Sequence, residues 1–354
     1  MSLIKVNVGP LRNFNNLVYH LGPKLKEIRD AFVVGQTPDI VFDFKELSYG
    51  SISISGLTAL LSSAKKLRDF LGHSIVAEIP WNQKVQGFLS DIGFFEISSK
   101  FLIFDFSRSN IGGYTIGSGN PNNKIIYFAD IIPIKSIPIE DIGIIKAKHK
   151  QRIAPNFILR CSNIFDGFDV KLQSIITNTS LELIVNSLMH GEEISFVGLQ
   201  RTSKRITVTV CDSGIGFPKS LSRTFPGEFK YETPKHIDAI LFGCLAQKQQ
   251  HGLRLAISEI LNYDENDLFT NTNDGWVVIS SFNTEIRWQK NLWGKAMENY
   301  EKGKKKGEKI NVRNILGPPL QEYADLSIIE NGYWKEYNSL LIGTRITFEI
   351  PIEF

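Results

Sequence analysis

The chain contains few of the residues that stabilise secreted or membrane-spanning proteins. Its 354 residues include three cysteines, Cys161, Cys211 and Cys244, which are widely spaced and form no CxxC pair. This pattern predicts neither a disulfide framework nor a zinc site. The N-terminus lacks the charged segment and apolar run of a signal peptide, and no apolar stretch approaches the roughly 20 residues that cross a bilayer. We therefore expect a cytoplasmic protein without membrane contact.

The sequence also lacks an excess of either charge. Its 40 Lys and Arg residues nearly balance 37 Asp and Glu residues, which argues against a dedicated nucleic-acid or membrane-surface binder. The length exceeds the size at which a single hydrophobic core stops growing, so two domains are expected, with one large domain as the alternative.

The first hundred residues predict a small α/β domain. A buried strand over residues 40–44 is followed by a Gly/Ser-rich turn, a helix with leucines on one face that stops at Gly72, and another strand over residues 74–79. This order, with the turn Ser53-Ile54-Ser55-Gly56-Leu57, resembles the STAS fold of anti-anti-sigma factors. The regulatory phosphoserine of that family would fall on Ile54, so the resemblance implies a STAS-like domain without its phosphorylation switch. Another small α/β layer is the alternative.

Residues 101–160 are expected to form a packed connector. They carry Gly and Asn clusters and then an apolar run that begins at Ile131. The remainder, residues 161–354, is expected to form the second domain. Its charge-dense stretch over residues 302–309 is typical of a solvated loop.

The first element whose side chains could bind a ligand or catalyse a reaction is a helix that runs from an Asp169 cap to about His190. Glu182, Asn186 and His190 are spaced i, i+4 and i+8, which places them along one helix face. A carboxylate can take a proton from water, an amide oxygen can bind a hard cation, and an imidazole can contact phosphate. The alternative is that this face is merely the wet side of a soluble helix.

Three further elements follow it in the sequence. An alternating strand over residues 205–210 leads into Asp212-Ser213-Gly214-Ile215-Gly216, where a buried carboxylate would accept from an exocyclic amine. Gly252 opens a helix whose free N–H groups suit phosphate. A final strand begins at Gly343-Thr344, where the threonine could bond a base or a water beside Asp212.

In this order the four elements resemble the nucleotide-binding boxes of the GHKL ATPase superfamily, which includes gyrase and the histidine kinases. The resemblance covers about residues 165–354 and implies ATP and Mg²⁺ as ligands. It also implies an α/β sandwich whose mixed, mainly antiparallel sheet is covered by helices on one face, with a mobile ATP lid over residues 218–251. The implied roles are a general base at Glu182, the Mg²⁺ ligand at Asn186, a phosphate-side contact at His190, the adenine acceptor at Asp212, the base pocket at Gly214 and Gly216, phosphate contacts at Lys248, His251, Gly252 and Leu253, and an adenine neighbour at Thr344.

Two departures accompany this resemblance. The family's second glycine motif survives only at Gly252, with Gln250 and Arg254 in the other glycine positions. Arg254 could attract phosphate or face solvent. An insertion is expected over residues 284–337, where Trp288, Trp293 and Trp334 accompany the lysine cluster. Such a mixture could bind nucleic acid, but a packed insertion with a wet edge is the favoured interpretation.

The sequence thus predicts a Mg²⁺-dependent ATP-binding protein. The first hypothesis is a slow ATPase that acts as a conformational switch on a protein partner or within a homodimer. The alternative is a serine/threonine protein kinase of the anti-sigma-factor type that acts on a separate partner, because Ile54 offers no hydroxyl in cis. A scaffold that binds nucleotide without chemistry is the third hypothesis, and the carboxylate at position 182 argues against it.

Overall fold

The N-terminal part of the computed structural model is a parallel sheet with helices packed on one face. The structure describes residues 3–12, 14–107, 122–132, 137–224, 236–245, 252–261, 275–308, 312–316 and 334–352. The sheet has the order β1-β2-β3-β4, with every neighbouring pair parallel. Alternate residues along these strands are buried against the helices. The elements are β1 (Leu3–Asn7), α1 (Phe14–Val33), β2 (Asp39–Asp43), α2 (Ile54–Leu71), β3 (Ile75–Glu78), α3 (Gln83–Asp91), α4 (Phe94–Lys100) and β4 (Phe104–Asp105).

The helix α2 begins and ends at signals that are local in the sequence. The Ser53 hydroxyl accepts a hydrogen bond from the Gly56 amide, which satisfies one of the free donors at the helix N-terminus. At the other end Gly72 has a φ of 76° and its N–H donates to the Arg68 carbonyl. The predicted stop at Gly72 is confirmed, and the helix already begins within the expected turn, at Ile54.

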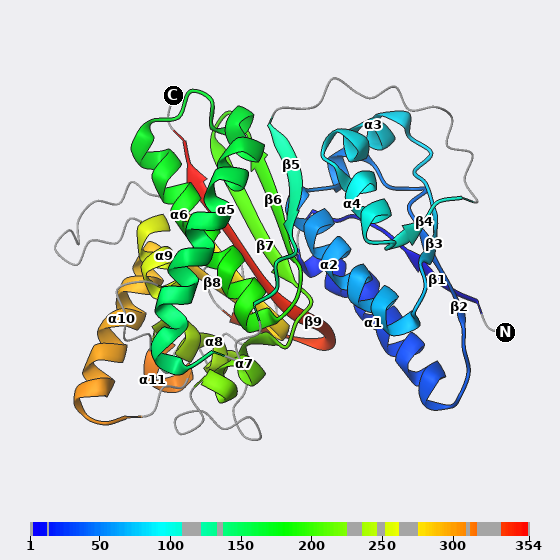
Figure 1. Ribbon diagram of the computed structural model, residues 1–354. Coiled ribbons are helices and arrows are strands. Elements are labelled where there is room, and N and C mark those ends of the chain that lie inside the picture. The colour runs from blue at the N-terminus through cyan, green and yellow to red at the C-terminus, as the bar shows by residue number, and fades with distance from the viewer. Residues whose placement is uncertain are drawn as a thin grey trace.

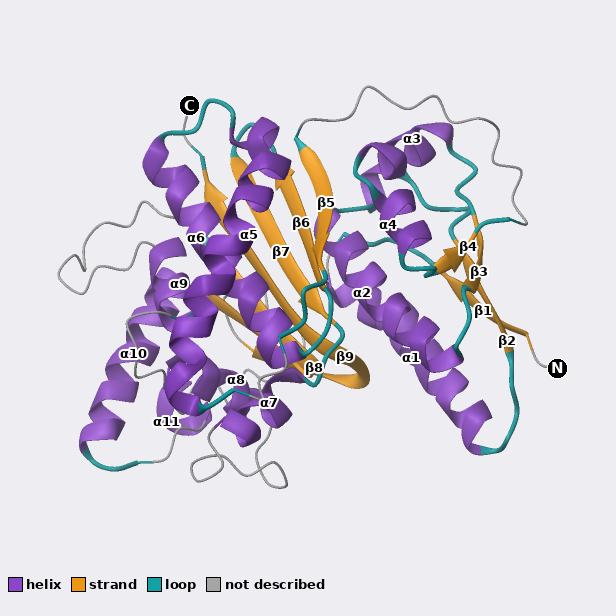
Figure 2. Cartoon of the chain, viewed as in Figure 1, coloured by secondary structure: helices purple, strands orange, loops and turns teal. Residues whose placement is uncertain are grey.

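The C-terminal part contains a second sheet in the order β5-β6-β7-β9-β8 (Figure 2). Every described ladder in it is antiparallel, so the expected mixed sheet is wrong in that detail. The edge strand β5 comes from the expected connector. β8 and β9 are long, so the chain between them spans residues 290–333 rather than 284–337. The strands are β5 (Asn123–Phe128), β6 (Ser195–Arg201), β7 (Arg205–Asp212), β8 (Trp276–Gln289) and β9 (Trp334–Pro351).

The two faces of this sheet are covered by different parts of the chain (Figure 1). One face packs against C-terminal helices in a single apolar core. The other packs against α2, which contacts β6, β7 and β9 and joins the N-terminal core to Phe196 and Cys211. The antiparallel sheet is therefore buried on both sides. The C-terminal helices are α5 (Ile142–Phe165), α6 (Val170–Asn186), the π-helical turn η4 (Ser187–Gly191), α7 (Gly216–Thr224), α8 (His236–Leu245), α9 (Leu253–Ile260), α10 (Lys290–Lys305) and α11 (Val312–Leu316).

Two of the three tryptophans of the expected insertion are structural. Trp288 lies on β8 and Trp293 on α10, and both side chains are fully buried, with ring centroids 5.0 Å apart in an edge-on arrangement. The Trp293 Nε1–H donates to the Ser258 hydroxyl at 3.0 Å. These two rings cannot stack on nucleic-acid bases, so they support the packed-insertion interpretation. Among the described residues, no helix is long and apolar enough to cross a membrane.

Candidate functional site

The helix that carries the first motif is shorter than expected and ends in an irregular turn. The Asp169 side chain caps α6 by accepting from the Leu172 amide at 2.8 Å, which confirms the predicted start. After Asn186 the chain continues as the π-helical turn η4, which contains His190. Such turns often lie at functional sites because they re-aim side chains that a regular helix would place elsewhere.

The Glu182 side chain is buried rather than solvated. It is 3% exposed and forms ion pairs with two lysines of α5, Lys146 on Oε1 and Lys150 on Oε2. The Asn186 Nδ2 also donates to Oε1 at 3.2 Å. Burial raises the pKa of Glu182, but the charges and hydrogen bonds of the lysines outweigh burial and hold this pKa below its usual value. The wet-face interpretation is therefore wrong for Glu182.

Two polar atoms beside this carboxylate have no hydrogen-bond partner among the described residues. They are the Asn186 amide oxygen and the Thr179 hydroxyl, both of which are buried atoms. Because buried polar groups are normally paired, such atoms suit a ligand that the protein binds. An amide oxygen fits Mg²⁺, which commonly takes one or two protein ligands together with phosphate and water oxygens. The described residues contain no cluster of three or more His, Cys, Asp or Glu side chains that could hold a metal alone.

The Asp212 turn is tied to the final strand. Asp212 ends β7 opposite Thr344 of β9, and its Oδ1 accepts from the Gly214 amide at 2.9 Å and the Thr344 amide at 3.2 Å. Both backbone bonds end on Oδ1, which leaves Oδ2 without a backbone donor, and the Ser187 hydroxyl also lowers the pKa of the carboxyl group through a hydrogen bond. Burial raises the pKa of Asp212 to about 6, against the lowering effect of the two amides. Thr344 contacts Asp212 through its backbone N–H.

The glycines of this turn allow close packing within the protein. A Cβ on Gly214 would lie 2.0 Å from the Gly191 carbonyl oxygen, and one on Gly216 would lie 2.2 Å from the Phe282 ring. Gly216 also has a φ of 69°, which side chains rarely tolerate. The space that the two glycines leave is thus filled by η4 and by β8. η4 and the Asp212 turn consequently form one packed unit.

His190 lies within this unit. Its Nδ1 is 3.1 Å from the Ser220 hydroxyl of α7. Burial lowers the pKa of His190 to about 4, with a further lowering from the charge on Lys146. The imidazole is therefore neutral at neutral pH, and it would meet a phosphate as a hydrogen-bond donor without a positive charge.

A cavity of about 430 Å³ opens beside Glu182, between α5, α6 and α9. Its size is within the range of small-molecule sites. Gly252, the N-cap of α9, forms part of the wall, and the first amides of that helix have no acceptor one turn earlier within it. Asn186, His190 and Asp212 are not in the lining, which comprises Lys150, Gln151, Ala154, Asn178, Thr179, Leu181, Glu182, Gly252, Leu255, Ala256 and Glu259.

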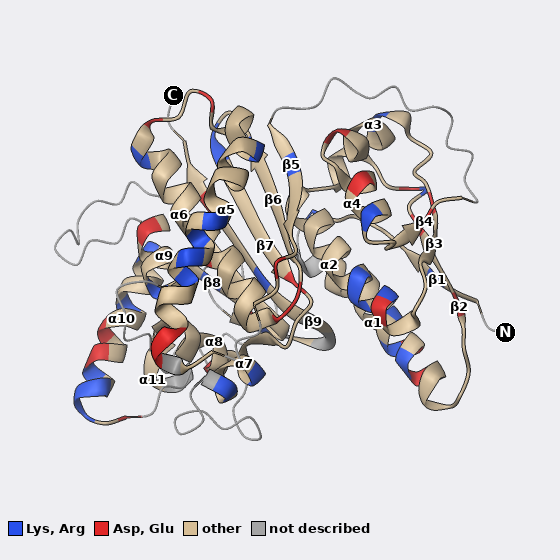
Figure 3. Cartoon of the chain, viewed as in Figure 1, with Lys and Arg blue, Asp and Glu red and all other residues tan. Residues whose placement is uncertain are grey.

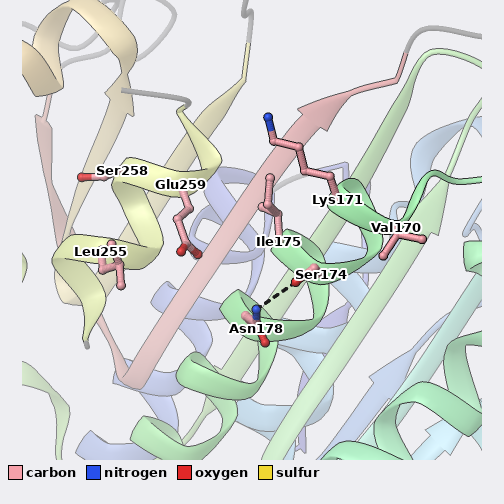
Figure 4. Close-up of a pocket in the computed structure, with 8 residues that line it drawn as sticks. All are labelled: Val170, Lys171, Ser174, Ile175, Asn178, Leu255, Ser258 and Glu259. Carbon is pink, nitrogen blue, oxygen red and sulfur yellow. Dashed lines mark hydrogen bonds between the residues drawn. The ribbon is translucent and has the colours of Figure 1, made fainter. Parts of the chain in front are cut away.

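A second hollow continues from this cavity along α6 and α9 (Figure 4). It has a volume of about 740 Å³ and shares Asn178, Leu255 and Glu259 with the first. Asn178 Nδ2 donates to the Ser174 hydroxyl at 3.1 Å on its floor. The two hollows together form a groove that runs from Glu182 toward the start of α6.

The structure places the remaining expected site residues as follows. Leu253 is buried in the core, and Lys248 and His251 lie outside the described residues. Within the expected lid, α8 is packed into the core and is no mobile cover. Arg254 points away from the cavity and pairs with Glu301 of α10 at 3.2 Å, with its guanidinium over the Tyr300 ring.

The sequence interpretation missed Lys146 and Lys150. They lie in the segment that was expected to be a connector, and their i, i+4 spacing was the available signal for a basic face on a helix. Only the packing of α5 against α6 places that face on Glu182.

Comparisons of the chain with protein-family models, curated proteins and solved structures return no match.

Proposed function

We propose that this protein binds ATP with Mg²⁺ and uses slow hydrolysis to reset a nucleotide-driven conformational switch. The proposal is supported by one observation above all. Glu182 and Gly252, which come from distant parts of the sequence, line one cavity beside α6, Asn186 donates to Glu182, and Asp212 lies on the neighbouring strand β7 outside that cavity. The antiparallel sheet under these helices agrees with that architecture.

The proposed site has a base end and a phosphate end. Asp212 Oδ2 recognises the adenine amino group, and the cavity beside Glu182 takes the phosphates, which the N-terminus of α9 stabilises through its amides and dipole. Asn186 contributes its unpaired oxygen to Mg²⁺.

Hydrolysis at this site requires a base. A water oxygen forms a bond to the terminal phosphorus, and the bond from that phosphorus to the bridging oxygen breaks, so that its electron pair stays on ADP. Glu182 accepts the proton of the attacking water.

The contact between α2 and the sheet supports a switch. β7 and β9 carry the Asp212 turn on the face that packs against the C-terminal helices. The neighbouring Arg345 faces α2 on the opposite side and donates to the Ser63 hydroxyl at 3.0 Å. Arg345 is only 3% exposed. A nucleotide that shifts the strand ends therefore acts directly on the N-terminal domain, because packed interfaces transmit small displacements.

The same contact disfavours a kinase that phosphorylates its own STAS-like domain. Ile54, at the position of the family's phosphoserine, is buried against the sheet. The neighbouring Ser53 hydroxyl donates to the Leu11 carbonyl and accepts from the Gly56 amide. Phosphate transfer would have to reach a separate protein.

Calorimetric titration of the purified chain with MgATP tests the proposal. Asp212→Asn should weaken ATP binding by about 1–3 kcal/mol, because a buried acceptor is replaced in part by a donor. The matched exposed variant Asp39→Asn should bind as the wild type does. Undiminished affinity in Asp212→Asn would remove the assignment of the base end.

Turnover is followed with ATP labelled on its terminal phosphate. Release of free phosphate supports the switch, and this release should be lost in Glu182→Gln. Label on an added protein would instead support the kinase, and the absence of both products would leave a scaffold.

A further inference from the structure

Two lysines of α5 hold the central carboxylate of the proposed site. Lys146 and Lys150 are one helical turn apart, and their side chains are only 14% and 26% exposed. α5 carries basic segments where it crosses α6 (Figure 3). Lysine is seldom buried without a reason, since its ammonium group is strongly hydrated.

The lysines differ in their access to the cavity. Lys150 is part of its wall, together with Glu182, Thr179 and the N-cap Gly252. Lys146 is deeper, and its charge also acts on His190. The unpaired Thr179 hydroxyl lies beside them on α6. An anion in the cavity would therefore meet an ammonium group, a hydroxyl and the amides of a helix N-terminus.

Other described cations do not serve this end of the cavity. Arg254, at the start of α9, is turned toward Glu301. The glycine motif that would wrap phosphates is reduced to Gly252. Glu259 also lines the cavity, and its negative charge would repel an anion.

We infer that Lys146 and Lys150 bind the terminal phosphates of the nucleotide. When the nucleotide enters the cavity, both lysines release Glu182 and exchange it for phosphate. The inference rests on the proposed function. The ligand class is a polyphosphate anion, and the two ammonium groups take the place of the missing glycine motif.

Binding of tripolyphosphate, MgATP and adenosine to the full chain, measured by calorimetry, tests the inference. Lys150→Gln and Lys146→Gln should each weaken tripolyphosphate and ATP binding by about tenfold, the usual effect of one charge-assisted hydrogen bond. Adenosine binding should not change. Lys148→Gln removes the same charge from an exposed position of the same helix and should have no effect.

A second variant keeps the test independent of folding. Glu182→Gln should strengthen tripolyphosphate binding about tenfold, because the lysines no longer have a competing carboxylate. The same change should give a much smaller gain when both lysines are already replaced, that is, when the triple variant Lys146→Gln/Lys150→Gln/Glu182→Gln is compared with Lys146→Gln/Lys150→Gln. In the triple variant no buried charge is left unpaired. A gain of equal size without the lysines would show that Glu182 only repels the anion, and it would overturn the proposal that the lysines exchange Glu182 for phosphate.

The outcomes separate the two proposals. If the wild type binds ATP and the lysine variants bind it equally well, the inference fails and the proposed function stands. If the wild type binds tripolyphosphate through the lysines but shows no preference for ATP, the anion site stands and the adenine-binding function fails.

Discussion

Replacement of Gly198 by alanine should loosen the contact between the two halves of the molecule. Gly198 lies in β6 beneath α2, where a Cβ atom would be 2.2 Å from the Thr58 hydroxyl oxygen and 2.6 Å from Ile54 Cγ2. Neither neighbour can yield easily. Both residues are fully buried, and the Thr58 hydroxyl donates to the Ile54 carbonyl at 2.7 Å.

The size of the effect follows from this geometry. α2 would have to retreat by about 1 Å to restore an ordinary contact, and overpacking of this kind costs about 1–3 kcal/mol. Urea denaturation should show that loss as a lower transition midpoint with an unchanged slope. Gly198→Ala should also reduce any response of the N-terminal domain to nucleotide, because the contact that carries it is displaced.

Two further variants decide whether α2 is responsible. Thr58→Ala removes the nearest clashing atom, so the double variant should be more stable than the sum of the single effects predicts, by about 0.5–3 kcal/mol. Gly87, inside α3, has nothing within 4 Å of its Cβ position. Gly87→Ala should therefore stabilise the chain by up to about 1 kcal/mol. Full stability of Gly198→Ala, or strict additivity with Thr58→Ala, would refute the packing of α2 on β6.

The remaining predictions concern pH and the α10 contact. Because the pKa of Asp212 is raised to about 6, the folded state binds the extra proton between pH 4 and 6, and the contribution of Asp212 to stability falls as pH rises through this window. ATP affinity should rise over the same range, as the accepting carboxylate forms, and a flat titration curve would contradict the role of Asp212. The pKa of His190 is lowered to about 4, so the unfolded chain takes up a proton on His190 before the folded protein does. The contribution of His190 to stability therefore falls as pH drops from 6.5 to 4, opposite to that of Asp212. In the wild type the contributions of Asp212 and His190 offset each other in acid. Asp212→Asn removes the first of them, so the free energy of unfolding of this variant should fall by about 3 kcal/mol as pH drops from 6.5 to 4. An unchanged stability profile would contradict the role of His190. Trp293→Phe should cost about 1–3 kcal/mol in urea denaturation, because the Ser258 hydroxyl loses its buried donor, and a neutral result would show that this bond does not hold α10 to α9.

The sequence by itself determined the local elements of this protein. The caps of α2 at Ser53 and Gly72 and the cap of α6 at Asp169 are side-chain and backbone bonds between near neighbours, so their residue types indicate them directly. The strand that leads to Asp212 follows from its alternating pattern, because every second side chain of a half-buried strand faces the core. Local order also placed Glu182 and Asn186 on one helix.

The tertiary structure alone decided what surrounds these elements. Periodicity makes Glu182 a polar position on a helix, whereas the arrival of α5 makes it a buried carboxylate between Lys146 and Lys150, 36 and 32 positions earlier in the chain. The insertion of β9 between β7 and β8 brings the Thr344 amide to Asp212 across 132 positions. Such contacts depend on how whole elements pack, and a pattern that repeats every two or four residues carries no information about which distant segment will cover it.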